Sequence, residues 1–151
     1  MDNRFNDWKW QLENMIKTPI ELKKYLDLTE DQVEEILSVS KIYKMGISPY
    51  FASIMKKDEA SCPIRRQSIP SYGELDNSEA LCADPLVENE LSPVKRLVHK
   101  YPDRVALFAS NMCFTYCRHC TRKNTVINET SAITDQELEE IFKYIEQNQQ
   151  I

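Results

Sequence analysis

The chain has 151 residues, which is about the length of one domain. Its composition, 42% hydrophobic and 28% charged, is that of an ordinary folded protein, and no apolar run is long enough to cross a membrane. The net charge of −5 argues against a nucleic-acid partner, and the first residues do not form a signal peptide. We therefore expect a cytoplasmic protein with neither a membrane nor a nucleic-acid partner.

The first half of the chain is predicted to be helical. Apolar side chains recur at roughly helical spacing within residues 3–16, at Trp8, Leu12 and Met15. Thr18 is followed by a proline and by Glu21, which is the pattern of a capping box, so a short helix should run to about Tyr25.

A second capping box, from Thr29 to Gln32, predicts a longer helix. Gly46 and Pro49 should end its pattern. The residues expected to form its buried stripe are Val33, Ile36, Leu37, Ser40 and Tyr43 with Lys44.

Residues 56–98 contain four prolines and little apolar periodicity, which predicts an extended, irregular segment held against another surface. The run from Arg104 to Ala109 is apolar after its first residue, as expected of a strand buried on both faces of a parallel sheet. A third capping box, from Thr134 to Glu137, opens a final helix. The apolar residues of that helix are Leu138, Ile141, Phe142 and Ile145.

These elements predict three parts: a helical region over residues 1–55, an extended linker over residues 56–100, and the start of a core domain over residues 101–151. The expected fold class is α/β and mostly helical. The strand, the loop after it and the final helix would form the first unit of an α/β barrel or a doubly wound sheet. In both folds, active sites lie at the carboxyl ends of the strands.

Three thiols lie close together after the predicted strand, since Cys113, Cys117 and Cys120 have the spacing C-x3-C-x2-C. In a reducing compartment cysteines are better interpreted as metal ligands or free thiols than as disulfides. Thiolates are the preferred ligands of iron–sulfur clusters, and three of them can hold three irons of a 4Fe–4S cluster. The fourth iron would then be open to bind a substrate. The remaining cysteines, Cys62 and Cys82, stand alone and are expected to be ordinary thiols.

Five stretches of the sequence match the pattern of one enzyme family. They are Tyr-Pro-Asp-Arg at 101–104, Cys-x3-Cys-Arg-His-Cys-Thr-Arg at 113–122, and residues 7–11, 47–50 and 67–70. The cysteine spacing alone indicates radical S-adenosylmethionine (SAM) chemistry. With the residues between the cysteines, the chain resembles the N-terminal portion of the lysine 2,3-aminomutase family.

The resemblance implies a partial TIM-like radical SAM barrel and three cofactors: a 4Fe–4S cluster, SAM and pyridoxal 5′-phosphate (PLP). In this family the cluster reduces SAM to a 5′-deoxyadenosyl radical, and PLP assists the migration of an amino group between the α and β carbons of an amino acid. The implied partners are an amino-acid substrate, an electron donor such as flavodoxin or ferredoxin, and further copies of the full-length chain.

The resemblance also implies roles for single residues. Lys100 stands where relatives often have a phosphate-binding arginine, and it keeps the charge but not the bidentate geometry. The other implied roles are the cluster for Cys113, Cys117 and Cys120, SAM for His119, the PLP phosphate for Arg104 and the substrate carboxylate for Arg122. Catalytic residues are not assigned.

Several family features have no counterpart in this sequence. Neither Gly46 nor Gly73 fits the glycine pair that contacts SAM, and no lysine follows Lys143 to hold PLP. A parallel strand also needs neighbours, and one convincing strand is predicted. We therefore expect an N-terminal fragment, a truncated product or one part of a split enzyme, which is inactive alone.

Three alternatives stay open. The first is a radical SAM protein of the same branch that has another substrate or does not use PLP. The second is a non-catalytic remnant, or an oligomerisation partner built on the N-terminal helices. The third is a small zinc-binding module with His119 or His99 as the fourth ligand.

Overall fold

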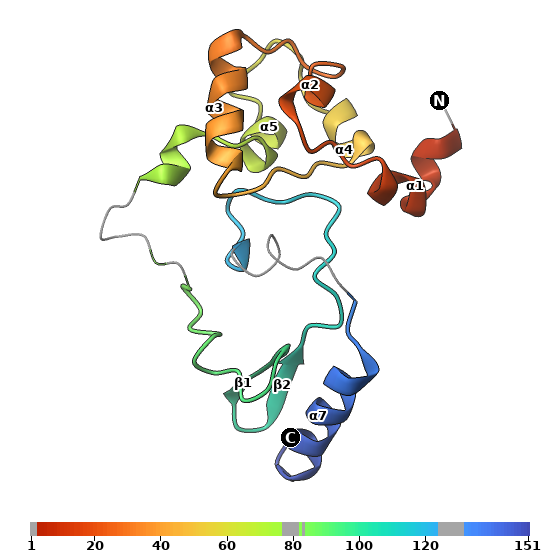
Figure 1. Ribbon diagram of the computed structural model, residues 1–151, viewed down its shortest axis with the longest axis vertical. Coiled ribbons are helices and arrows are strands. Elements are labelled where there is room, and N and C mark those ends of the chain that lie inside the picture. The colour runs from red at the N-terminus through yellow and green to blue at the C-terminus, as the bar shows by residue number, and fades with distance from the viewer. Residues whose placement is uncertain (1–2, 77–81, 83, 124–131) are drawn as a thin grey trace.

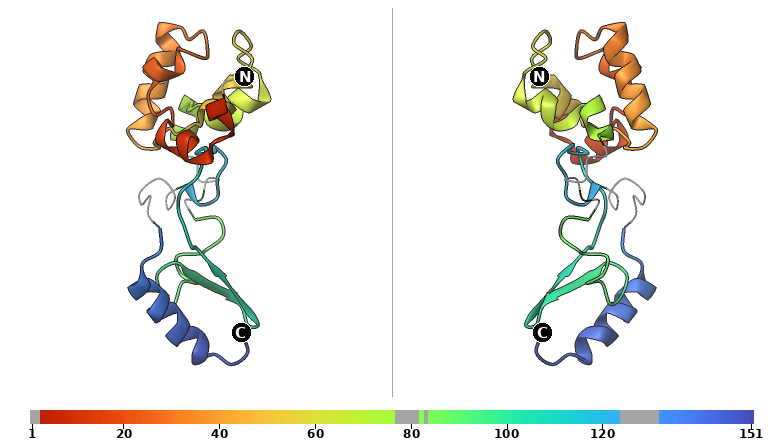
Figure 2. Two further views of the ribbon diagram at one scale, coloured as in Figure 1. Left: turned by 90° about the vertical axis from the view of Figure 1, so that its right-hand side faces the viewer. Right: turned by 90° about the vertical axis from the view of Figure 1, so that its left-hand side faces the viewer.

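The computed structural model describes residues 3–76, 82, 84–123 and 132–151. A group of short helices lies at one end, and a two-stranded hairpin with one helix lies at the other (Figure 1). Two further views agree, with the first helices (red) at one end and the C-terminus near the hairpin at the other (Figure 2). We call residues 3–70 the helical region. A membrane-crossing helix is not found within the described ranges.

The helical region contains one short 3-10 helix and five α-helices. A second 3-10 helix follows it. In chain order these elements are η1 (Asn3–Asn6), α1 (Trp8–Glu13), α2 (Pro19–Leu22), α3 (Glu30–Ser40), α4 (Pro49–Ser53), α5 (Pro63–Ser68) and η2 (Tyr72–Leu75). The capping boxes predicted at Thr18 and Thr29 are confirmed. Each threonine hydroxyl accepts a hydrogen bond from the N–H three residues on, and Glu21 and Gln32 accept one in return.

The first predicted helix is not continuous. The Asp7 carboxylate accepts a hydrogen bond from the N–H of Lys9 and starts a new helix there, so residues 3–16 divide into η1 and α1. Trp8 is 59% exposed, whereas Met15 is buried beyond the end of α1. The apolar spacing of these residues therefore did not mark a single buried helix face.

The core of the helical region forms where α2 and α3 meet the segments around Ile47. Ile36 is 1% exposed, as predicted, and Val39 on the same helix is fully buried. Leu37 is 49% exposed, so its predicted burial is wrong. Successive helix residues point about 100° apart, so a core that faces Ile36 and Val39 leaves Leu37 pointing away from it.

The irregular segment contains more regular structure than predicted, because α5 and η2 both lie in it. Pro63 occupies the first turn of α5, where its missing N–H leaves no partner unsatisfied. Ser71 and Glu74 form a fourth capping box, with the N–H of Ser71 donating to the Glu74 carboxylate at 3.0 Å. The division of the chain at residues 55 and 100 stays a prediction.

The predicted parallel strand is instead one arm of an antiparallel hairpin. β1 (Leu97–Tyr101) pairs with β2 (Arg104–Leu107), with Leu97 opposite Leu107 and Tyr101 opposite Arg104. The residues of β2 are exposed or half-buried, so the prediction of burial on both faces is wrong. A two-residue connection favours antiparallel pairing, whereas parallel strands need a long crossover. Among the described residues the sheet has these two strands.

The final helix, α7 (Asp135–Glu146), begins at the predicted capping box of Thr134 and Glu137. Ile141 is fully buried, but Phe142 is 55% exposed. Glu137 forms ion pairs at 3.1 Å with Lys95 and Arg96. These ion pairs tie the start of α7 to the segment that leads into β1.

Candidate functional site

The three thiols lie in a segment that we call the cysteine loop, residues 111–123. After β2 the chain runs from the hairpin to the helical region, and the loop docks there (Figure 1). Three backbone hydrogen bonds hold it. The N–H of Ser48 donates to the Phe114 carbonyl at 2.8 Å, Tyr116 to Gly46 at 2.7 Å, and Arg118 to Gln67 at 2.7 Å.

Close packing supports this backbone pairing. Tyr116 is 9% exposed and packs with Met15 in a small core cluster. A β-carbon on Gly46 would lie 2.7 Å from the Met15 methyl carbon and 2.8 Å from the Tyr116 ring. Glycine at position 46 therefore allows the loop to approach the helical region.

Cys113, Cys117 and Cys120 are half-buried free thiols. Burial raises the pKa of Cys113, and the charges of Cys120 and Cys117 raise it further. Three thiols that would repel one another as anions suit a cationic iron–sulfur cluster, so the chemistry of the donor set fits.

The cysteine side chains are not gathered in this conformation. Within the described ranges, no three His, Cys, Asp or Glu side chains form a group that could hold a metal ion. Cluster ligation by Cys113, Cys117 and Cys120 stays a prediction.

Arg122 already binds a carboxylate that belongs to the chain itself. Its Nε and Nη2 donate to the two Glu88 carboxylate oxygens at 2.8 and 2.7 Å, which is the bidentate arrangement typical of arginine. The guanidinium also stacks over the Phe108 ring, 4.5 Å from its centroid. The Arg122 guanidinium, predicted to pair with a substrate carboxylate, is thus paired with Glu88 in this structure, and its pairing with a substrate stays a prediction.

The residues predicted to bind the PLP phosphate lie apart from the cysteine loop. Lys100 on β1 and Arg104 at the start of β2 are near the hairpin turn, whereas the loop follows the opposite end of β2. Arg104 is exposed, pairs with Asp103 at 3.4 Å and stacks over Tyr101. Lys100 donates to the Leu86 carbonyl at 3.3 Å. His119, predicted to lie by SAM, is an exposed residue of the loop.

Three charged residues around the loop were not predicted from the sequence: Arg118, Glu74 and Glu88. Arg118 and Glu74 form a nearly buried ion pair at 2.6 Å. The Ser71-x-x-Glu74 pattern is a capping-box signature and could have revealed an ordered turn at Glu74. No local signal marks Glu88, which meets Arg122 across 34 residues of sequence.

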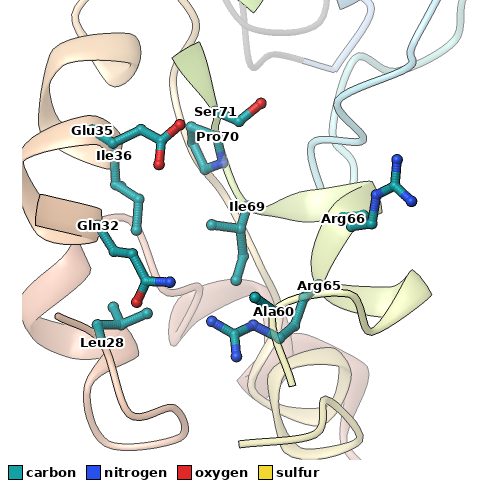
Figure 3. A pocket seen from close by; sticks show the side chains of 10 residues that line it. All are labelled: Leu28, Gln32, Glu35, Ile36, Ala60, Arg65, Arg66, Ile69, Pro70 and Ser71. Atoms are coloured by element: carbon teal, nitrogen blue, oxygen red, sulfur yellow. The ribbon is translucent and has the colours of Figure 1, made fainter. Parts of the chain in front are cut away.

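A pocket of about 330 Å³ lies between α3 and α5, within the helical region. Arg65 and Gln32 point toward each other across it, whereas Arg66 points away (Figure 3). The Arg65 guanidinium also donates to the Lys57 carbonyl at 3.1 Å. None of the predicted site residues lines this pocket, so it is separate from the cysteine loop.

Comparison with known proteins gives relatives for nearly the whole chain. Over 150 residues, 99% of its length, it is 39% identical to the L-lysine 2,3-aminomutase of Fusobacterium nucleatum and covers 35% of that protein. It is 40% identical over 154 residues to the L-lysine 2,3-aminomutase of Methanococcus maripaludis, of which it covers 35%. It is 34% identical over 148 residues to the glutamate 2,3-aminomutase of Clostridioides difficile, of which it also covers 35%. No family model matches the chain.

The chain thus spans about a third of the length of the curated relatives it matches. The alignment covers 99% of the chain's residues, so it includes both the helical region and the cysteine loop. Over nearly its whole length, the chain is thus similar to one part of proteins named lysine or glutamate 2,3-aminomutase.

Proposed function

We propose that this chain is the cluster-carrying part of a radical SAM, PLP-dependent amino-acid 2,3-aminomutase. The observation that carries the proposal is the C-x3-C-x2-C loop, docked on the helical region of a chain that matches aminomutases over 99% of its length. When bound, the cluster would supply the electron that cleaves SAM, and PLP would carry the amino group during its migration.

Different residues of the chain would bind the cluster, SAM, the substrate and PLP. Three thiolates would hold three irons and leave the fourth iron open, with His119 beside the SAM bound there. Arg122 would exchange the Glu88 carboxylate for the carboxylate of the amino-acid substrate, keeping the same bidentate geometry. Arg104 and Lys100 would neutralise the phosphate of PLP.

Other parts of this proposal depend on the segments of the relatives that this chain does not cover. Because the chain covers about a third of each relative, we propose that a barrel, the lysine that holds PLP and the determinants of substrate choice lie in the rest of such an enzyme. Relatives named for lysine and for glutamate both match. The proposed substrate class is therefore an α-amino acid recognised through its carboxylate.

Anaerobic reconstitution with iron and sulfide tests the proposal. The chain should bind about four irons and four sulfides and become brown. Serine substitution of Cys113, Cys117 or Cys120 should abolish or strongly reduce this uptake, because each removes a ligand. The matched controls Cys62→Ser and Cys82→Ser should bind as much iron as the unchanged chain.

Two results would contradict the proposal. One is uptake that is the same in the loop variants and in the controls. The other is a chain that binds one zinc ion in a colourless complex and takes up no iron and sulfide, which would favour a zinc module instead.

A further inference from the structure

Arg118 lies between two predicted cluster ligands, and its side chain forms hydrogen bonds with the helical region and with Glu74 of η2. Its guanidinium donates to both Glu74 oxygens, at 2.9 and 2.6 Å, and to the carbonyls of Lys44 and Tyr43, at 3.0 and 3.2 Å. Its backbone N–H also donates a hydrogen bond to the Gln67 carbonyl. One residue of the loop is therefore fixed by contacts with three separate segments.

Glu74 is itself held in place before it meets Arg118. It belongs to η2, where its carboxylate accepts the N–H of Ser71, and the N–H of Tyr72 donates to the Glu35 carboxylate of α3 at 2.7 Å. Lys123, at the far end of the loop, also pairs with Glu74 and lies over the Tyr43 ring at 3.8 Å. Glu74 thus receives cations from both sides of Cys120.

We propose that Arg118, Glu74 and Lys123 form a clamp that anchors the cysteine loop, with its predicted cluster ligands, on the helical region. The inference rests on the proposed function in one respect, since the benefit of the clamp is cluster binding. The mechanical part, that the clamp restrains the loop, stands without any cluster.

The burial of the clamp side chains indicates that their ion pairs and hydrogen bonds fix the position of the cysteine loop. The side chains of Arg118 and Glu74 are only 6% and 11% exposed. A buried ion pair contributes little net stability, because the loss of hydration offsets the attraction, and its best-attested use is to fix one arrangement among several. The arginine fork and four hydrogen bonds leave Arg118 one orientation.

The rates at which the cysteines of the cluster-free chain react with iodoacetamide, measured separately for each cysteine by mass spectrometry, test the clamp. We compare the unchanged chain with Glu74→Gln and Arg118→Gln at one pH. Both variants should speed the modification of Cys113, Cys117 and Cys120 about fivefold or more, because the loop opens more often. Cys62, which is 3% exposed in the helical region, should keep its rate and serves as the internal control.

The two variants separate a mechanical effect from an electrostatic one. Glu74→Gln removes a negative charge from the clamp, whereas Arg118→Gln removes a positive one. A pure charge effect would therefore change the two rates in opposite directions. Glu137→Gln, which breaks an ion pair at α7 instead, controls for a general loss of stability.

Each outcome decides the inference. Faster modification of the loop thiols in both clamp variants, with Cys62 and Glu137→Gln unchanged, supports the clamp. Opposite changes, no change, or equal acceleration of Cys62 would overturn it. In the reconstituted chain, the clamp variants should also lose iron to a chelator faster. Failure of the unchanged chain to take up iron would refute the proposed function. The clamp would still be tested, because the iodoacetamide rates are measured on the cluster-free chain.

Discussion

Gly46 is the residue at which the cysteine loop comes closest to the helical region. Gly46→Ala would place a β-carbon 2.7 Å from the Met15 methyl carbon and 2.8 Å from the Tyr116 ring. Met15 can move aside, but Tyr116 is held by its own hydrogen bond to the Gly46 carbonyl. We expect the free energy of unfolding to fall by about 1–3 kcal/mol, the usual range for overpacking, as measured by urea denaturation.

The second glycine provides the control for this substitution. A β-carbon on Gly73 would meet only the Ser71 hydroxyl oxygen, at 3.8 Å, so Gly73→Ala should change stability by less than about 0.5 kcal/mol. Equal effects at the two positions would show that the loop does not pack on Gly46.

Glu137 has the largest resolved carboxyl pKa shift among the described residues, from 4.5 to about 2. The N–H of Thr134 is the main cause, burial opposes it, and Lys95 and Arg96 add to it. Because the folded pKa lies below the unfolded value, the stabilisation is complete above about pH 4.5 and is lost as the pH falls toward 2.

The difference between the unchanged chain and Glu137→Gln, measured by thermal unfolding from pH 7 to pH 2, isolates this carboxyl group. We expect a constant difference above pH 4.5 that shrinks steadily below it. A difference that does not depend on pH would mean that Glu137 is not ionised within its cap and ion pairs.

At the scale of elements, α3 tests where the core of the helical region lies. Ile36→Ala should cost about 2–5 kcal/mol, because Ile36 is 1% exposed and the change leaves a cavity. Leu37→Ala, one residue on, should cost less than about 1 kcal/mol, because Leu37 is 49% exposed. Denaturant unfolding of the two variants measures both stability losses. A larger loss for Leu37→Ala than for Ile36→Ala would place the core on the other face of α3.

Elements that depend on four consecutive residues could be predicted from the sequence. The caps at Thr18, Thr29 and Thr134 are of this kind, since each threonine and its partner satisfy each other's backbone groups locally. The environment of β2 could not be predicted in the same way, because the partner of a strand decides its burial. Its partner β1 carries His99 and Lys100 among its five residues, so no apolar pattern marked it.

The same distinction applies to the candidate site. The thiols were identified because Cys113, Cys117 and Cys120 are neighbours with a recognisable spacing. The contact between Arg118 and Glu74 spans 44 residues and joins two segments with no shared pattern. Only the folded arrangement shows that one charged residue of the motif holds the loop.

At the scale of the whole molecule, the cysteine loop joins the two ends of the structure. It follows the hairpin along the chain and docks on the helical region by backbone, aromatic and ionic contacts. Contacts among the described residues of this chain are therefore sufficient to hold the loop in place. We propose that cluster binding and SAM binding belong to this chain, whereas amino migration requires the rest of such an enzyme.

Electron paramagnetic resonance of the reconstituted and reduced chain, titrated with SAM under anaerobic conditions, tests this claim most directly. The account predicts a reduced 4Fe–4S signal that changes shape when SAM is added, because three protein thiolates leave one iron open to it. A cluster whose signal does not respond to SAM, or no cluster at all, would contradict the claim that this loop is a SAM-binding radical centre.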